Sequence, residues 1–198
     1  MLEIIQSGGW VMVPIVLCSV IASAIVIERF VFLRKNRIFP RSVIEKVWTW
    51  VEDNDITKDK IETLKNSSLL GKVLATGLEY RNQPRFVIQQ RLEDVGRQVT
   101  SELEQFLYIL EIIVSIAPFL GLLGTVIGMI EIFQTVTLST SASSKELAGG
   151  IATALITTVG GLLVAIPALV FHKIFLNKIS EIVLAMEREA TRLLDVLS

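Results

Sequence analysis

The stretch LAGGIATALITTVGGLLVAIPALVF, residues Leu147–Phe171, contains no charged side chain. A helix rises about 1.5 Å per residue, so this stretch is longer than the roughly 30 Å core of a bilayer requires. Two further uncharged stretches occur, WVMVPIVLCSVIASAIVI over Trp10–Ile27 and the run Ile112–Ile130. Together they predict an all-α membrane protein with three transmembrane helices and long helices that extend into the cytoplasm.

The composition supports a membrane protein and argues against several other classes. Of the 198 residues 52% are hydrophobic, and the mean hydropathy is +0.60, higher than is usual for a soluble domain. The formal net charge of -1 provides no basic field for nucleic acid. Cys18 is the one cysteine and His172 the one histidine, and no glycine-rich phosphate loop occurs. We therefore expect no enzyme activity, no catalytic residues, no metal and no cofactor.

The basic residues predict the orientation in the membrane. No Lys or Arg precedes the first apolar stretch, and Lys145 is the one basic residue between the second and third. Basic residues follow the first and third stretches: Arg29, Arg34, Lys35, Arg37, Arg41 and Lys46, then Lys173, Lys178, Arg188 and Arg192. By the positive-inside rule the N-terminus lies outside and the C-terminus inside. A cleaved signal peptide would carry its basic residues before the apolar core, so we expect the first stretch to be retained.

These patterns predict seven segments along the chain. They are an outside segment over 1–9, transmembrane helices over 10–33, 106–133 and 147–172, a cytoplasmic helical domain over 34–105, an outside loop over 134–146 and a cytoplasmic C-terminal helix over 173–198. Apolar residues recur at helical spacing from Phe86 to Leu103 and run into the second stretch, which predicts one continuous helix there. A second stripe, from Phe175 to Leu197, packs either on this chain's own cytoplasmic domain or on another subunit.

Small residues and prolines are concentrated in the second and third stretches. Small residues let membrane helices approach closely, and a Gly-x-x-x-Gly spacing occurs at Gly124 and Gly128. The residues expected at tight helix contacts are Pro118, Gly121, Gly124, Gly128, Gly150, Gly161, Ala165 and Pro167.

One face of the third stretch is too small and polar for lipid, and is a candidate wall of a narrow pathway. Ala154, Thr158, Gly161 and Ala165 share this face, while Thr153 and Thr157 lie on an adjacent strip. The alternative for each threonine is a hydrogen bond to its own backbone one turn earlier. Proton relays in membranes usually contain a carboxylate or a histidine, and this stretch has neither. If protons cross here, we expect the proton-carrying group on a partner.

Two segments identify a family by resemblance. The segment Ala117–Val126 (APFLGLLGTV) resembles the second-span signature of the ExbB/TolQ proton-channel family, and Gly150–Thr158 (GIATALITT) with Gly161–Ala168 (GLLVAIPA) resembles its third-span signature. The Glu28–Arg29 pair that closes the first stretch is similar too, and the resemblance covers nearly the whole chain.

The resemblance implies a proton-driven motor in the bacterial inner membrane, with the N-terminus in the periplasm. It implies a ring of five copies around an ExbD- or TolR-like single-span partner dimer, whose aspartate is protonated by proton flow. The resulting motion of the partner dimer is passed to a TonB- or TolA-like transducer. The proton is the coupling ion, and no binding of nucleic acid is expected. By motif matching, Thr125 and Thr158 correspond to pore-facing threonines near that aspartate.

The sequence also departs from this family and leaves alternatives open. Many relatives carry a glutamate where this chain has Thr153, so a proton-handling role cannot be transferred to that position. A TolQ-like role in envelope maintenance shares the same motifs as the ExbB-like role. A MotA-type stator usually has four spans, which argues against it, and a passive, non-conducting membrane scaffold would need the small residues but not the hydroxyl face.

Overall fold

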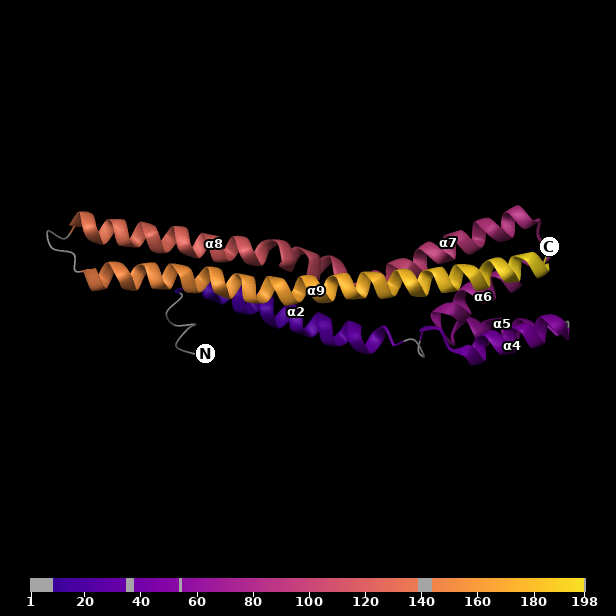
Figure 1. Cartoon of the computed structure of the whole chain (residues 1–198). Helices are drawn as coiled ribbons and strands as arrows, with labels where there is room; N and C mark the ends of the chain where they lie inside the picture. The colour runs from indigo at the N-terminus through magenta and orange to yellow at the C-terminus, as the bar shows by residue number, and fades with distance from the viewer. Residues whose placement is uncertain (1–8, 35–37, 54, 139–143, 198) are drawn as a thin grey trace. The chain divides into compact units, whose positions relative to one another are not determined.

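A computed structural model describes residues 9–34, 38–53, 55–138 and 144–197, and within these ranges the regular structure is helical throughout (Figure 1). The helices are α2 (Met12–Phe32), α4 (Arg41–Glu52), α5 (Lys58–Lys65), α6 (Leu69–Glu79), α7 (Arg85–Glu104), α8 (Leu107–Leu138) and α9 (Ser144–Leu197). The all-α fold predicted from the sequence is therefore confirmed. The chain divides into two compact units: unit 1 contains Met1–Glu28 and Phe106–Lys173, and unit 2 contains Arg29–Gln105 and Ile174–Ser198.

Three described helical segments are long and apolar enough to cross a membrane, as the sequence predicts. They are Met12–Phe32, Leu107–Gln134 and a part of Ala148–Leu197. Large apolar side chains such as Trp10, Phe119 and Leu163 are two-thirds exposed on this single chain, which is unfavourable in water and favourable in lipid or at a subunit contact. The residues at which these helices enter a bilayer stay a prediction.

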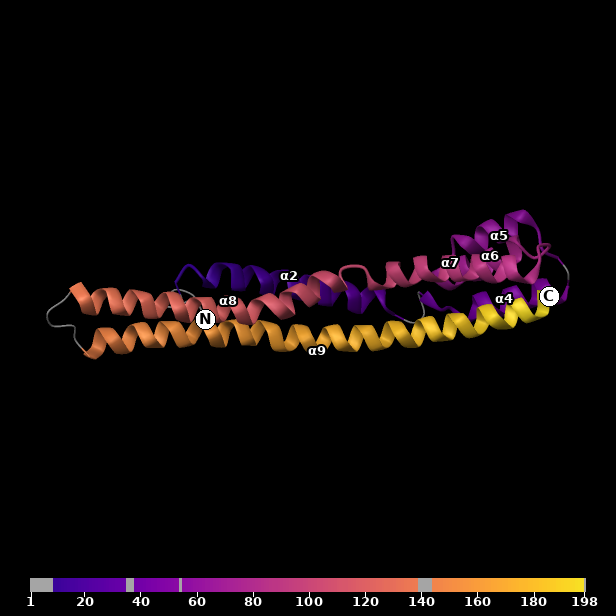
Figure 2. The ribbon, with the colours of Figure 1, turned by 90° about the horizontal axis from the view of Figure 1, so that it is seen from above.

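In unit 1 α8 and the first half of α9 run side by side (Figure 2). Their contacts run in opposite order along the two helices, since Gly121 meets Thr158 while Gly128 meets Ala154. They form an antiparallel hairpin. The start of α2 packs on this hairpin through Met12 and Ile15, and a small cluster forms with Leu120, Ile127 and Val164.

Unit 2 has its own apolar core of helices α4 to α7 and the end of α9. Ser68 caps α6 by accepting a hydrogen bond from the Gly71 amide at 3.0 Å, a typical N-cap contact. The C-terminal stripe of α9 is buried within this chain at Phe175, Ile179, Ile182, Met186, Ala190 and Leu193. The intrachain alternative for this stripe is thus the correct one.

The predicted continuous helix from Phe86 into the second span is wrong. The chain forms two helices, because Gln105 is extended (φ -48°, ψ 139°) and Phe106 adopts a left-handed conformation with φ +63°. Neither residue is a glycine or proline, so the sequence carries no local signal for the break. A regular spacing of apolar residues indicates which face of a helix is buried. It does not indicate that the helix is interrupted over two residues.

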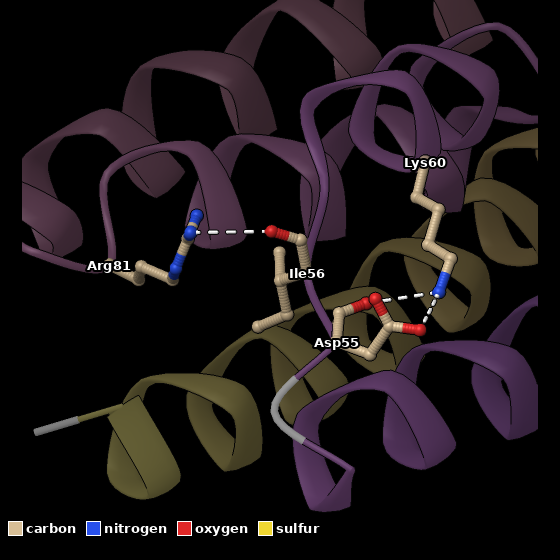
Figure 3. Close-up of polar contacts among 4 residues, drawn as sticks. All are labelled: Asp55, Ile56, Lys60 and Arg81. Carbon is tan, nitrogen blue, oxygen red and sulfur yellow. Dashed lines mark hydrogen bonds and ion pairs between the residues drawn. The ribbon is translucent and has the colours of Figure 1, made fainter.

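Two cations hold the turn between α4 and α5 in place. The Lys60 ammonium donates to the Asp55 carboxylate at 2.5 Å and to the Asp55 carbonyl at 3.2 Å (Figure 3). Arg81 donates through Nη2 to the Ile56 carbonyl at 3.4 Å and through Nη1 to the Leu78 carbonyl at 2.9 Å. The second contact supplies a donor to the last turn of α6, where backbone carbonyls lack helical partners.

Candidate functional site

Polar groups meet in unit 1 where glycines bring the backbones of α8 and α9 close together. A Cβ atom at Gly121 would lie 2.9 Å from both the Thr157 carbonyl oxygen and the Thr158 Cα, so a glycine is required there. The Gly121 carbonyl accepts hydrogen bonds from Thr158 Oγ1 at 3.2 Å and from Thr157 Oγ1 at 3.3 Å. The close approach thus places two hydroxyl groups on one backbone carbonyl.

Thr157 lies inside the helix contact. Thr157 is 1% exposed, and its one hydroxyl proton is shared between the Ala154 carbonyl, 2.7 Å from Oγ1, and the more distant Gly121 carbonyl. The Gly124 backbone lies directly against this side chain, where an added Cβ would come 2.6 Å from Thr157 Cβ. The prediction that Thr157 lines an open pathway is corrected: its hydroxyl group is enclosed between two helices of one chain, and it contributes to packing.

Thr125 and Thr158 are more accessible. Both side chains are partly exposed on this chain, and Thr125 lies one turn after Gly121 on α8. Thr125 Oγ1 donates to the Leu122 carbonyl at 2.7 Å. A threonine hydroxyl has one proton and two lone pairs, so these two side chains have committed their protons to backbone carbonyls and keep acceptor capacity. Thr153 lies in α9, but its side chain is outside the described part of the structure.

The residues predicted at helix contacts fall into three groups. Gly121, Gly124, Gly128 and Gly161 are buried between α8 and α9, and Gly150 lies against the Ile132 side chain. Ala165 is also buried, at 5% exposure. Both prolines lie inside helices; Pro118 is partly exposed and Pro167 is exposed on this single chain, so a helix contact at Pro167 stays a prediction.

Ionisable groups near this site are few in the described ranges. Glu111 and Glu131 both lie on α8 with exposed side chains, and His172 is buried in α9 at 6% exposure. Among the described residues no group of three or more His, Cys, Asp or Glu side chains is placed to hold a metal ion. The chemistry available at the α8–α9 contact is that of hydroxyl and carbonyl oxygens.

The sequence reasoning missed two features. It did not identify the Gly121 carbonyl as a shared acceptor, because backbone groups leave no trace in a sequence pattern. It also used Arg29 only as a basic residue that indicates the orientation, whereas Arg29 is 1% exposed and donates to the Leu103 carbonyl at 3.0 Å. The sequence feature that could have indicated a buried arginine is its position directly after an apolar run. An arginine at the membrane surface occupies the same position, so the two cases cannot be separated from the sequence.

Comparison with known proteins places these features in a family. Residues 65–188, which include Thr125, Thr157 and Thr158, match the model of the MotA/TolQ/ExbB proton channel family. The chain belongs to this family. Several of its relatives in this family carry ExbB names, which confirms the resemblance seen in the sequence.

Three relatives illustrate the similarity. The chain is 31% identical over 178 residues to the biopolymer transport protein ExbB-like 3 of Synechocystis, covering 86% of this chain and 82% of that protein. It is 29% identical over 180 residues to ExbB-like 1 of the same organism, covering 89% of this chain and 71% of that protein. It is 38% identical over 90 residues to the biopolymer transport protein ExbB of Aquifex aeolicus, covering 46% of this chain and 61% of that protein. This MotA/TolQ/ExbB chain is therefore similar to ExbB proteins over most of its length.

Proposed function

We propose that this chain is the pore-forming scaffold subunit of an ExbB-like motor, driven by the proton-motive force across a bacterial inner membrane. Several copies, five by analogy with the family, surround a single-span ExbD-like partner dimer, and the motion energises TonB-dependent transport across the outer membrane. The N-terminus lies in the periplasm and the C-terminus in the cytoplasm, following the distribution of basic residues. The proton is the coupling ion. The names of the relatives favour this role over a TolQ-like one.

The observation that carries the proposal is the pair of partly exposed threonines beside the Gly121 carbonyl, inside the region that matches the family. The hydroxyl protons of Thr125 and Thr158 are directed at backbone carbonyls. The lone pairs that remain accept a hydrogen bond from a neutral carboxyl group or from a hydrated proton, and they offer no proton to a carboxylate. Such a surface favours the protonated form of a carboxyl group that a partner brings to it.

The energetics fit this assignment. One elementary charge that crosses 100 mV releases about 2.3 kcal/mol. A neutral acceptor surface binds the partner's protonated carboxyl group without a fixed counter-charge. A fixed counter-charge would instead hold the carboxylate in a lasting ion pair. The proton can then leave on the other side, and the partner is free to move to the next subunit.

Proton flux into liposomes that contain the complex tests the proposal. Thr158→Val removes the hydroxyl group at nearly constant volume and should lower the flux severalfold, whereas Thr158→Ser should retain most of it. Replacing the partner's intramembrane aspartate by asparagine should abolish the flux. The matched control is Thr157→Val, which should act mainly on stability.

The native mass of the complex, with every co-purifying chain identified, should accompany this assay. A ring with a single-span partner and no proton flux in any variant would indicate a non-conducting scaffold. A partner of the TolR type would shift the assignment to envelope maintenance. A deletion would then cause detergent sensitivity, whereas deletion of an ExbB-like subunit would cause failure to use iron chelates.

A further inference from the structure

A buried arginine ends the first apolar helix. Arg29 is 1% exposed, and its Nη1 donates to the main-chain carbonyl of Leu103 at 3.0 Å, across 74 positions of the sequence. Its guanidinium carbon lies 4.7 Å from the centre of the Phe32 ring. Arg29, Phe32 and Leu103 all belong to unit 2. A fully buried arginine is rare in proteins and needs a reason other than contact with solvent or lipid headgroups.

The reason lies in how α7 ends. The last four carbonyls of a helix have no helical donor, and they form the negative end of the helix dipole. Here the chain cannot continue the α7 ladder, because Gln105 is extended and Phe106 is left-handed. Leu103 is 0% exposed, so water has little access to its backbone. A cation that donates to the Leu103 carbonyl satisfies both the hydrogen-bonding need and the dipole.

We propose that Arg29 is a positioning residue of the motor, which caps the carboxyl end of α7 from a distant part of the chain. Leu103 precedes Leu107, the first residue of α8, by four positions, and α8 carries Gly121 and Thr125. The cap fixes the end of α7 and so defines the residue at which α8 begins. Energised function requires the cap, and Arg29 acts on it through the end of α7. The functional half of this inference rests on the proposed function.

Arg81 provides a matched control, because it makes the same kind of contact at another helix. Its Nη1 donates to the Leu78 carbonyl at 2.9 Å, in the last turn of α6. The two arginines therefore cap two different helices in unit 2. Arg81 acts on Leu78, three positions away, and on the Ile56 carbonyl, so its loss should affect α6 and the turn before α5 and leave α7 intact.

Hydrogen exchange of the intact complex, read by mass spectrometry, tests the cap directly. Arg29→Met should speed exchange of the amides at 101–104 about tenfold to hundredfold, the effect of losing a hydrogen bond to a charged group, and leave 69–79 unchanged. Arg29→Lys keeps the charge and one donor, and should give an intermediate rate. Arg81→Met should speed exchange at the end of α6 and leave 101–104 unchanged.

Proton flux is measured on the same preparations. At equal amounts of assembled complex, Arg29→Met should lower the flux severalfold, Arg29→Lys should partly restore it, and Arg81→Met should leave it near the wild-type value. Should Arg29→Met fail to accumulate, an ester in place of the Leu103–Glu104 peptide bond weakens the acceptor while Arg29 stays. The ester removes the Glu104 N–H, so exchange is then read at 101–103, where it should accelerate, and the flux should fall as in Arg29→Met.

Three results would overturn the inference. The first is unchanged exchange at 101–104 in Arg29→Met, and the second is equal acceleration there in Arg81→Met, which would indicate general loosening of unit 2. The third is normal flux in a variant whose α7 end exchanges rapidly. A wild-type complex that conducts no protons would contradict the proposed function instead, and the exchange results would still decide whether Arg29 caps α7.

Discussion

Gly121→Ala should destabilise the hairpin of α8 and α9, and its effect can be worked out from the contact geometry. The new Cβ would lie 2.9 Å from two atoms of the opposite backbone, where ordinary contacts begin near 3.4 Å. Both atoms belong to the main chain of α9, so no flexible side chain can turn away. The two helices must therefore separate by about 0.5 Å, the difference between those two distances.

The free-energy cost has three contributions. Overpacking of this kind typically costs about 1–3 kcal/mol. The hydrogen bonds from Thr157 and Thr158 to the Gly121 carbonyl are already 3.2–3.3 Å long, and losing them costs about 1 kcal/mol together at the values measured in membrane proteins. Alanine regains up to about 1 kcal/mol of helix propensity. The net effect should be a loss of about 1–3 kcal/mol in the free energy of unfolding.

Two further glycines complete the series. Gly128→Ala brings its Cβ to 3.1 Å from the Ala154 methyl group, which should cost only a few tenths of a kcal/mol. Gly149→Ala meets no atom within 4 Å and should be neutral or slightly stabilising. The assay is thermal unfolding of the purified protein in one detergent. If Gly121→Ala were as stable as Gly149→Ala, the close approach of the two backbones would be refuted.

Three predictions concern unit 2 and can be checked by the same unfolding measurement. Leu193→Ala should cost about 2–5 kcal/mol, because this side chain is 0% exposed; a smaller loss would mean that the core collapses around it. Ser68→Ala should cost about 1 kcal/mol, because the Gly71 amide loses its cap, and Ser68→Asp should retain the stability. Replacing Lys72 by methionine should cost less than about 1 kcal/mol in low salt and less still in high salt, since its ion pair with Glu102 is partly exposed.

The sequence predicts the helical fold and the three apolar helices because burial and membrane insertion depend on side-chain polarity summed over many residues. The tight contact of α8 and α9 was also predictable in kind, because Gly121, Gly124 and Gly128 recur at helical spacing. What the pattern could not decide was which threonine is buried in the contact and which stays partly exposed. Thr157 and Thr158 are neighbours of the same type, and a rotation of 100° about the helix axis separates a buried side chain from a partly exposed one.

The break between α7 and α8 and the role of Arg29 could not be predicted for a different reason. Both depend on backbone geometry at Gln105 and Phe106, where the residue types carry no turn preference strong enough to be noticed. The donor that satisfies Leu103 comes from a residue 74 positions away. A hydrogen bond at that separation follows from tertiary packing, and a single sequence contains no periodicity that reports it.

The buried stripe of α9 in unit 2 has a consequence for the evolution of this chain. Phe175, Ile179 and Leu193 lie on one helix, so the angle between members of the stripe is set by the helical twist of about 100° per residue. Insertion of a single residue near Ile182 would rotate the later members of the stripe out of phase with the earlier ones. An insertion at Asn82 and Gln83, between the end of α6 and the start of α7, would be absorbed by the turn. Length changes in unit 2 should therefore be tolerated between α6 and α7 and selected against within its part of α9.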